Sequence, residues 1–450
     1  MGTTETLAKW IVETSYEDIP PAAYEQAKKS ILDVLGTTIL GSTTDIGQLI
    51  IGHTQEEGGN PQARVIATDI KTTSANAAFA NGTMGHADDF DDLGGIGGHP
   101  AIVLTPPSLA LGEQHHFSGR DVLTAWAVGY EVGTRLSVNL HPDRDWHPTA
   151  IFGTMASAVA ASKLLGLDVH KTRMAMGIAG SEAAGLRRNF GTMTKPFHPG
   201  NASRSGVVAA KLAAMGYTAD PDIIEGRQGY ADNFGGIKCN LPAVSQFLGD
   251  FYYLASQGTR IKPWPCCGGN HRTLTGLLDL IQRYEINPDN IDYIEHVGAD
   301  APCTGALLRD EVQLGLEGKF CLRYNISAAV IDRKIDLSTF TDERAERDDV
   351  QQFMEKVRLV QNPDVLLRKE HIADGNMDAS VRVHMLDGSE HNVELGAAMH
   401  LTGDAVVDKF QANASFVFGE DRLAEPVRLV QNLEELDDVS RLMDAVTIGS

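Results

Sequence analysis

An acidic run at residues 85–92 is the first of four short segments that concentrate side chains able to do chemistry. Four carboxylates fall within five residues of this run, and a glycine-rich stretch then leads to His99 and Pro100. Because neighbouring carboxylates repel one another, the folded protein must supply cations, hydrogen bonds or solvent to hold them together. Most charge runs are solvated surface loops, so that alternative stands beside a functional site.

The other three segments carry basic, imidazole and thiol groups flanked by Pro and Gly. They span residues 145–149, 186–200 and 261–271. Pro fixes the direction of the backbone and Gly leaves room beside a reactive group. Together with His99, they contribute His147, Arg187, Lys195, Lys262, Cys267 and His271. Taken singly, such a residue is ordinary, since a histidine at a helix start usually caps or packs.

Composition limits the partners of the chain. With 60 acidic against 38 basic residues, the net charge of −22 argues against binding nucleic acid or anionic lipid through the general field. An anionic substrate would need a local cluster of cations. The five cysteines are few and odd in number, which points to a reducing compartment. The N-terminus does not resemble a signal peptide and no stretch reaches the length of a membrane span, so we expect a cytoplasmic protein without membrane contact.

Helices are expected to position most of these groups, since apolar residues recur at three- and four-residue spacing along the first half of the chain. The expected ranges are 4–14, 21–40, 45–55, 73–85, 102–117, 119–138, 149–165, 168–184 and 201–215. Their many Ala and Gly residues allow close helix–helix approach, which predicts a compact helical body. A short strand is expected at 64–68 and a glycine-rich loop at 226–236.

The pattern changes near residue 258 to a mixture of strands and helices. Strands are expected at 260–262, 292–299, 380–385 and 391–395, the last two joined by an Asp-Gly turn. Helices are expected at 272–284, 318–332, 348–356 and, in the tail, 433–446. A chain of 450 residues is long for one core. We therefore predict a mainly α protein with a large all-α helical domain, residues 1–257 with 403–450, and a smaller α+β domain, residues 258–402.

The chain resembles the MmgE/PrpD family, which includes 2-methylcitrate dehydratase, cis-aconitate decarboxylase and iminodisuccinate epimerase. The motifs that carry the likeness fall in the family's order over nearly the whole chain. They are residues 86–92 with His99-Pro100, Trp146-His147, residues 191–195, residues 262–267 with His271, and residues 318–324. The resemblance implies a helical domain closed by both chain ends, a smaller α+β lid domain, a homodimer, and a small polycarboxylate substrate handled without cofactor or metal.

The resemblance also implies site residues. The catalytic set is His147, Lys195, Asp89 and His99, and the substrate-binding set is Lys262, Cys267 and His271, joined by Arg187 and Arg323. The two arginines depart from the family pattern, where Met and Pro are common, and Leu93 stands where Thr is common. We expect His147 and Lys195 to form an acid/base pair and Asp89 to orient His99. Lys262 and Arg187 would hold substrate carboxylates.

These residue types suit proton abstraction next to a carboxylate, because cations stabilise the negative charge that develops and a neutral histidine can move the proton. A lyase of the dehydratase or decarboxylase type is favoured. An epimerase acting on an iminodisuccinate-like substrate and a non-catalytic organic-acid binder are the alternatives.

A magnesium-dependent diphosphate enzyme is a remote rival, in which Asp88, Asp89 and Asp92 would be the ligands. That interpretation requires a second acidic motif, and the sequence contains none with suitable spacing. Adjacent Cys266 and Cys267 do not have zinc-site spacing. His115, His116 and His198 are interpreted as ordinary surface or structural histidines.

Overall fold

Helices form most of the computed structural model, which describes residues 2–142, 145–298, 303–362 and 379–448. The prediction of a mainly α protein is confirmed. The helices of the first half are α1 (Thr3–Glu13), α2 (Pro21–Gly41), α3 (Asp45–Glu57), α4 (Ser74–Gly85), α5 (Pro100–His115), α6 (Gly119–Leu140), α7 (Pro148–Leu164), α8 (Val169–Glu182) and α9 (Thr194–Ala214). Their bounds follow the predicted ranges closely, with one exception that concerns the site.

Helix α9 begins at Thr194, whereas the sequence predicts a start at 201. Pro196 lies in its first turn, where an N–H has no partner within the helix, and Pro199 lies inside the helix, where its missing N–H removes one hydrogen bond. The helix continues through both prolines, so Lys195 belongs to its first turn rather than to a loop.

Small residues let α9 pack closely on α4. A Cβ atom on Gly82 of α4 would lie 2.9 Å from the Gly200 Cα atom of α9, and one on Gly200 would lie 2.7 Å from the Phe79 carbonyl oxygen. Such distances leave no room for a side chain at either position. This contact brings the end of α4 next to the start of α9.

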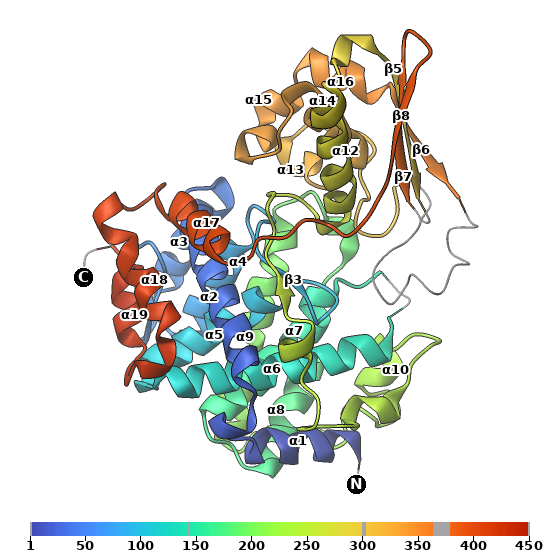
Figure 1. The fold of residues 1–450 in the computed structure, drawn as a ribbon. Coiled ribbons are helices and arrows are strands. Elements are labelled where there is room, and N and C mark those ends of the chain that lie inside the picture. Colours follow the sequence, from blue (N-terminus) through green and yellow to red (C-terminus); the bar gives the residue numbers. More distant parts are fainter. Residues whose placement is uncertain (1, 143–144, 299–302, 363–378, 449–450) are drawn as a thin grey trace.

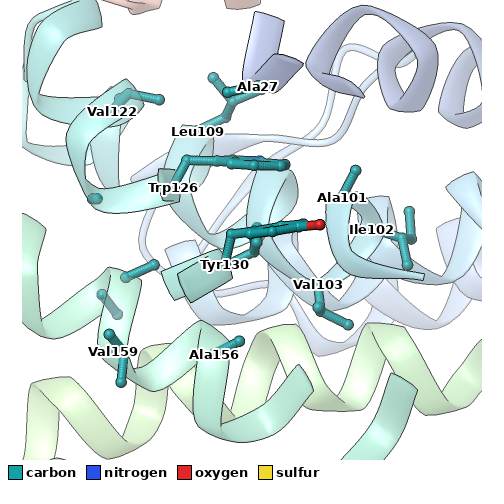
Figure 2. Close-up of a cluster of buried hydrophobic side chains, with 14 of the residues drawn as sticks. Ala27, Ala101, Ile102, Val103, Leu109, Val122, Trp126, Tyr130, Ala156 and Val159 are labelled. Atoms are coloured by element: carbon teal, nitrogen blue, oxygen red, sulfur yellow. The ribbon is translucent and has the colours of Figure 1, made fainter. Parts of the chain in front are cut away.

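The core of the body contains two stacked aromatic rings on α6. Trp126 and Tyr130 lie one above the other among small aliphatic side chains, with ring centroids 5.7 Å apart and an interplanar angle of 11° (Figure 2). Trp126 Nε1 donates to Thr105 Oγ1, and Tyr130 Oη donates to the Gly258 carbonyl at 2.7 Å. The polar atoms of both rings thus have hydrogen-bond partners. The bond from Tyr130 connects the core to the segment that leads out of the helical body.

A second buried cluster, distinct from that of the body, lies within residues 264–395. Here a four-stranded sheet has the order β6-β5-β7-β8, with β5 and β6 parallel and the other pairs antiparallel. The strands are β5 (Ile291–Gly298), β6 (Val357–Gln361), β7 (Ser380–Met385) and β8 (Glu390–Glu394), and the helices are α12 (His271–Tyr284), α13 (Gly315–Gly318), α14 (Leu322–Asp332), α15 (Asp342–Ala345) and α16 (Asp348–Met354). Figure 1 shows this unit on one side of the helical body.

Several details of the second half differ from prediction. The helix expected at 318–332 is divided into α13 and α14, and β6 was not predicted because its partner β5 is distant in sequence. The loop expected at 226–236 contains a short helix, α10 (Tyr230–Phe234), whose Tyr230 and Phe234 are buried against the core. The last residue of the strand expected at 292–299 lies outside the described residues.

The tail returns to the body, as Figure 1 shows where red helices lie beside blue ones. Helix α17 (Asp404–Ala414) packs on α2, and α18 (Ala424–Gln431) and α19 (Ser440–Ala445) follow. The single tail helix expected at 433–446 is wrong, because a 3₁₀ turn and a break precede α19. The predicted domain boundaries at 257/258 and 402/403 stay a prediction.

Short strands join distant parts of the chain. Strands β1 (Ala63–Arg64) and β2 (Lys71–Thr72) pair with each other, so β1 begins one residue before the strand expected at 64–68. Strand β3 (Leu93–Gly94) pairs with β4 (Thr259–Arg260), which places the acidic run beside the start of the α+β unit. Helix α11 (Tyr253–Ser256) precedes β4.

Among the described residues no single helix is long and apolar enough to cross a membrane; α2 and α3, bent by 87°, meet that test only when joined.

Candidate active site

The acidic run forms a buried turn after α4. Asp89, Asp91 and Asp92 are each at most 2% exposed, so the alternative of a solvated acidic loop is wrong. Asp89 has a φ of 51°, in the left-handed region that Asp tolerates better than most residues do. This conformation lets the main-chain carbonyl and the carboxylate of Asp89 face the same cation, Lys262.

Two buried lysines share the Asp89 carboxylate. Lys195 Nζ lies 3.0 Å and Lys262 Nζ lies 2.8 Å from Asp89 Oδ1, and Lys262 also donates to the Asp89 carbonyl at 2.6 Å. Lys195 comes from α9, and Lys262 comes from the segment after β4. Both lysines are at most 3% exposed. Buried ammonium groups need such partners, since an unpaired charge there would cost several kcal/mol.

Lys195 has a second partner, His86, the residue that caps the C-terminus of α4. The distance from Lys195 Nζ to His86 Nε2 is 2.6 Å, and the other ring nitrogen, His86 Nδ1, lies 2.7 Å from Asp91 Oδ1. The close packing of α4 on α9 sets the first of these distances. A continuous hydrogen-bonded chain therefore runs from Asp91 through His86 to Lys195.

Two further histidines stand at the starts of buried helices. His99 precedes Pro100 at the start of α5, and His147 precedes Pro148 at the start of α7. The main-chain N–H of His99 donates to Thr149 Oγ1 at 3.1 Å, which ties the two helix starts together. The imidazoles of His99 and His147 therefore face one shared space.

The carboxylate nearest to His99 is Asp91. His99 Nδ1 lies 3.2 Å from Asp91 Oδ2, whereas His99 Nε2 lies 3.5 Å from Asp89 Oδ1. The prediction that Asp89 orients His99 therefore needs correction. Asp89 is engaged by two lysines, and Asp91 is the carboxylate that lies against the imidazoles.

Of the two interpretations of His198, surface or structural, the structure excludes the surface one. His198 is 6% exposed, and its Nδ1 lies 3.0 Å from His147 Nδ1. One of the two nitrogens must donate and the other accept, so the tautomers of the two rings are linked. This contact engages Nδ1 of His147, so Nε2 is the ring nitrogen that it leaves unengaged.

Lys195, Lys262, His99 and His147 line one cavity of about 510 Å³ between the helical body and the α+β unit. Phe190, Phe320 and Cys267 form a small apolar cluster beside it. No carboxylate is found among the described residues that line the cavity. Its basic and imidazole lining residues are Arg187, Lys195, Arg260, Lys262, Arg272, His99, His147, His271 and His400. In a protein with a net charge of −22, this lining forms a local site for an anion.

Burial and neighbouring charges keep the histidines neutral. Burial lowers the pKa of His147 well below its usual range, and the Lys195 ammonium lowers it further. Burial also lowers the pKa of His99, against the opposing effect of Asp91. Burial lowers the pKa of His86 to about 4. All three rings are therefore uncharged near neutral pH and can accept a hydrogen bond or a proton.

The two lysines differ although both contact Asp89. Burial lowers the pKa of Lys195, and the attraction of Asp89 does not fully offset it. For Lys262 the carboxylates of Asp89 and Asp91 outweigh burial and raise the pKa. Burial would raise the pKa of Asp89, but the two ammonium groups hold it well below its usual value. Lys262 thus holds its proton more firmly than Lys195 does.

Most of the predicted site residues meet at this cavity, while their roles stay predictions. His99, His147, Lys195, Lys262, Arg187, Cys267 and His271 line it. Asp89 lies behind the two lysines. Burial raises the pKa of Cys267, so its thiol is protonated.

Arg323 does not line the cavity, so its assignment as a substrate-binding residue is wrong. Its guanidinium lies on α14, 2.7 Å from Asp310, and donates to the Val357 carbonyl. No role was predicted for Arg260, Arg272, His400 or His86. Arg260 and Arg272 directly flank the reactive segment 261–271, and His86 lies in the motif at residues 86–92.

The donor set does not fit a metal ion. Ligand atoms of His86, Asp89, Asp91 and His99 lie within 4.8 Å of one another, but the Lys195 ammonium already contacts both His86 and Asp89. The remote magnesium interpretation is also wrong in its geometry. The carboxylate of Asp88 pairs with Lys319, Asp89 with the two lysines, and Asp92 accepts from the Ala101 main-chain N–H.

Comparison with known proteins agrees with the motifs. The model of the MmgE/PrpD N-terminal domain matches residues 5–239, and that of the MmgE/PrpD C-terminal domain matches residues 264–435. The cis-aconitate decarboxylase of Homo sapiens is 29% identical over 459 residues, which cover 98% of this chain and 93% of the relative. The cis-aconitate decarboxylase of Aspergillus terreus is 28% identical over 476 residues, which cover 98% and 95%.

Proposed function

The chain belongs to the MmgE/PrpD family, and from this premise we propose that it is a cofactor-independent lyase acting on a small di- or tricarboxylate. Decarboxylation of a cis-aconitate-like substrate is the favoured reaction, because relatives that align over nearly the whole chain carry that name. The observation that carries the proposal is the cavity itself, where five basic side chains and four histidines line the wall.

Decarboxylation breaks the bond between a carboxylate and its carbon, and CO₂ leaves without the electron pair. The pair spreads into a remaining carboxylate, where Lys262 and Arg187 stabilise the added charge. Lys195 then delivers one proton to carbon and becomes a neutral amine, which water reprotonates after the product leaves. The product thus carries one proton in place of the CO₂ that was lost.

His147 separates this proposal from the epimerase alternative. Its Nδ1 is held by His198, which leaves Nε2 to meet the substrate. In decarboxylation His147 orients the substrate by a hydrogen bond. In epimerisation or dehydration it would be the base that removes a proton next to a carboxylate.

A substrate panel tests the function. The protein is incubated in deuterated water with cis-aconitate, methylcitrate and iminodisuccinate, and NMR follows each reaction. We expect CO₂ release from cis-aconitate and one deuterium on the product carbon that receives the proton. Exchange of an α-proton in iminodisuccinate without loss of carbon would favour the epimerase. No turnover and no exchange with any substrate would favour the non-catalytic binder.

The α+β unit is proposed as a lid over this cavity. Lys319 joins it to the acidic run through the carbonyl and carboxylate of Asp88, and Arg309 donates to the Phe190 carbonyl at 3.1 Å. Hydrogen exchange with and without substrate tests whether these contacts tighten. The cytoplasmic location and the homodimer are further proposals from the sequence, and light scattering measures the oligomeric state.

A further inference from the structure

The ammonium group of Lys195 has three N–H donors, and the structure accounts for two of them. One faces His86 Nε2 at 2.6 Å, and another faces Asp89 Oδ1 at 3.0 Å. Lys195 also lines the cavity. An ammonium is tetrahedral, so fixing two of its N–H bonds fixes the direction of the third. That third N–H has no hydrogen-bond partner among the described residues, and the ammonium lies 5.1 Å and 5.2 Å from the ring centroids of Phe190 and Phe320, so this N–H is available to a substrate.

The tautomer of His86, and with it the hydrogen bond to Lys195, depends on Asp91. A neutral imidazole has one donor and one acceptor nitrogen. Asp91 Oδ1, 2.7 Å from His86 Nδ1, can accept a hydrogen bond but cannot donate one while it is ionised. Burial would raise the pKa of Asp91, but its imidazole neighbours hold it well below its usual value. The proton of His86 therefore resides on Nδ1, and Nε2 presents its lone pair to Lys195.

The surroundings of His86 hold this tautomer in place. The titratable groups nearest to its ring are Asp91, Lys195 and Asp89, with His99 at a centroid distance of 4.4 Å and His147 at 6.3 Å. His86 is 1% exposed, so its ring is shielded from bulk solvent. The ring can donate only toward Asp91 without losing the contact to Lys195.

We propose that His86 is a positioning residue, whose tautomer is set by Asp91 and whose Nε2 aims the free N–H of Lys195 at the reacting carbon. This inference rests on the proposed function, because it assigns to Lys195 the proton that replaces CO₂. Lys262 lacks such an arrangement. Its hydrogen bonds to described residues both go to Asp89, which suits a fixed charge rather than a directed proton donor.

Two substitutions of His86 test separately its hydrogen bond to Asp91 and its hydrogen bond from Lys195. An Asn side chain places an amide near the position of Nδ1, so His86→Asn keeps a donor for Asp91 and loses the acceptor for Lys195. A Gln side chain reaches the position of Nε2, so His86→Gln keeps an acceptor for Lys195. The exposed His115, changed in the same two ways, provides the matched control.

The expected results differ in kcat and in stereochemistry. H86N should lose about 10²–10³-fold in kcat, within the range for a misplaced acid, with KM changed less than threefold. H86Q should stay within about tenfold of the wild type. In deuterated water the wild type should label the product carbon in a single configuration, and H86N should scramble it. Equal losses in H86N and H86Q, or a single configuration retained in H86N, would overturn the proposal.

A substrate-free measurement distinguishes failure of this inference from failure of the proposed function. In ¹⁵N-histidine-labelled wild-type protein, the His86 signals are assigned by their absence in H86Q. Long-range ¹H–¹⁵N spectra should show a protonated Nδ1 and an unprotonated Nε2. A proton on Nε2 would overturn the inference whatever the substrate is. A protein that shows the expected tautomer but turns over no compound of the panel would refute the function alone.

Discussion

Asp89→Asn tests the centre of the site, because it removes the charge that two buried lysines share. With an effective dielectric constant of about 20, each ion pair near 3 Å is worth about 5 kcal/mol of Coulomb attraction. Relaxation reduces the net effect of removing one partner of a buried pair to about 3–5 kcal/mol. Lys195, whose pKa burial already lowers, should therefore release its proton rather than stay charged.

The expected cost to catalysis follows from that loss. Since 1.4 kcal/mol corresponds to a factor of ten, we expect D89N to lower kcat by about 10²–10⁴-fold at neutral pH. The assay is CO₂ release measured across pH 5.5–9. In the proposed mechanism protonated Lys195 is the active form, so we expect activity below its pKa and a loss of activity as pH rises through it. In D89N this loss should shift to lower pH.

Asp88→Asn is the matched control for this experiment. It removes the same charge one residue away, but Asp88 pairs with Lys319 at 3.2 Å and not with either lysine of the cavity. We expect its alkaline limit of activity to match that of the wild type. If D89N keeps kcat within threefold and its pH profile is unchanged, the assignment of Lys195 as a proton donor tuned by Asp89 is refuted.

Three further predictions follow from the same geometry. Arg187→Met should raise KM by roughly 10–100-fold in a steady-state assay, because it removes a charged hydrogen bond to the substrate. Arg323 lies away from the cavity, so Arg323→Met should leave KM unchanged in the same assay. Burial and the Asp91 charge raise the pKa of Asp92, so ionisation of this carboxyl destabilises the folded protein as pH rises. Asp92→Asn should therefore raise the melting temperature at pH 7.5 but not at pH 4, and calorimetry measures both. Dialysis against EDTA should leave turnover intact, and a loss restored by a divalent cation would contradict the lysine-paired interpretation of the acidic run.

The sequence alone determined much of the fold, because helix periodicity is a local property. Ala- and Gly-rich segments with apolar residues at three- and four-residue spacing predicted the body helices to within a few residues. It also identified the four reactive segments, including the two His-Pro pairs at 99–100 and 147–148. Pro196 and Pro199 hid the first two turns of α9, since the sequence does not show whether a proline ends a helix or lies within it.

Only the tertiary structure decided which charges meet. Asp89 is 106 residues from Lys195 and 173 residues from Lys262, so no local pattern encodes their contact. The same limit explains why Arg323 was assigned to the site and His86 was not. Sequence shows which residue types are present. The close packing of α4 on α9, which requires the absence of a side chain at Gly82 and Gly200, decides which of them come within hydrogen-bond distance.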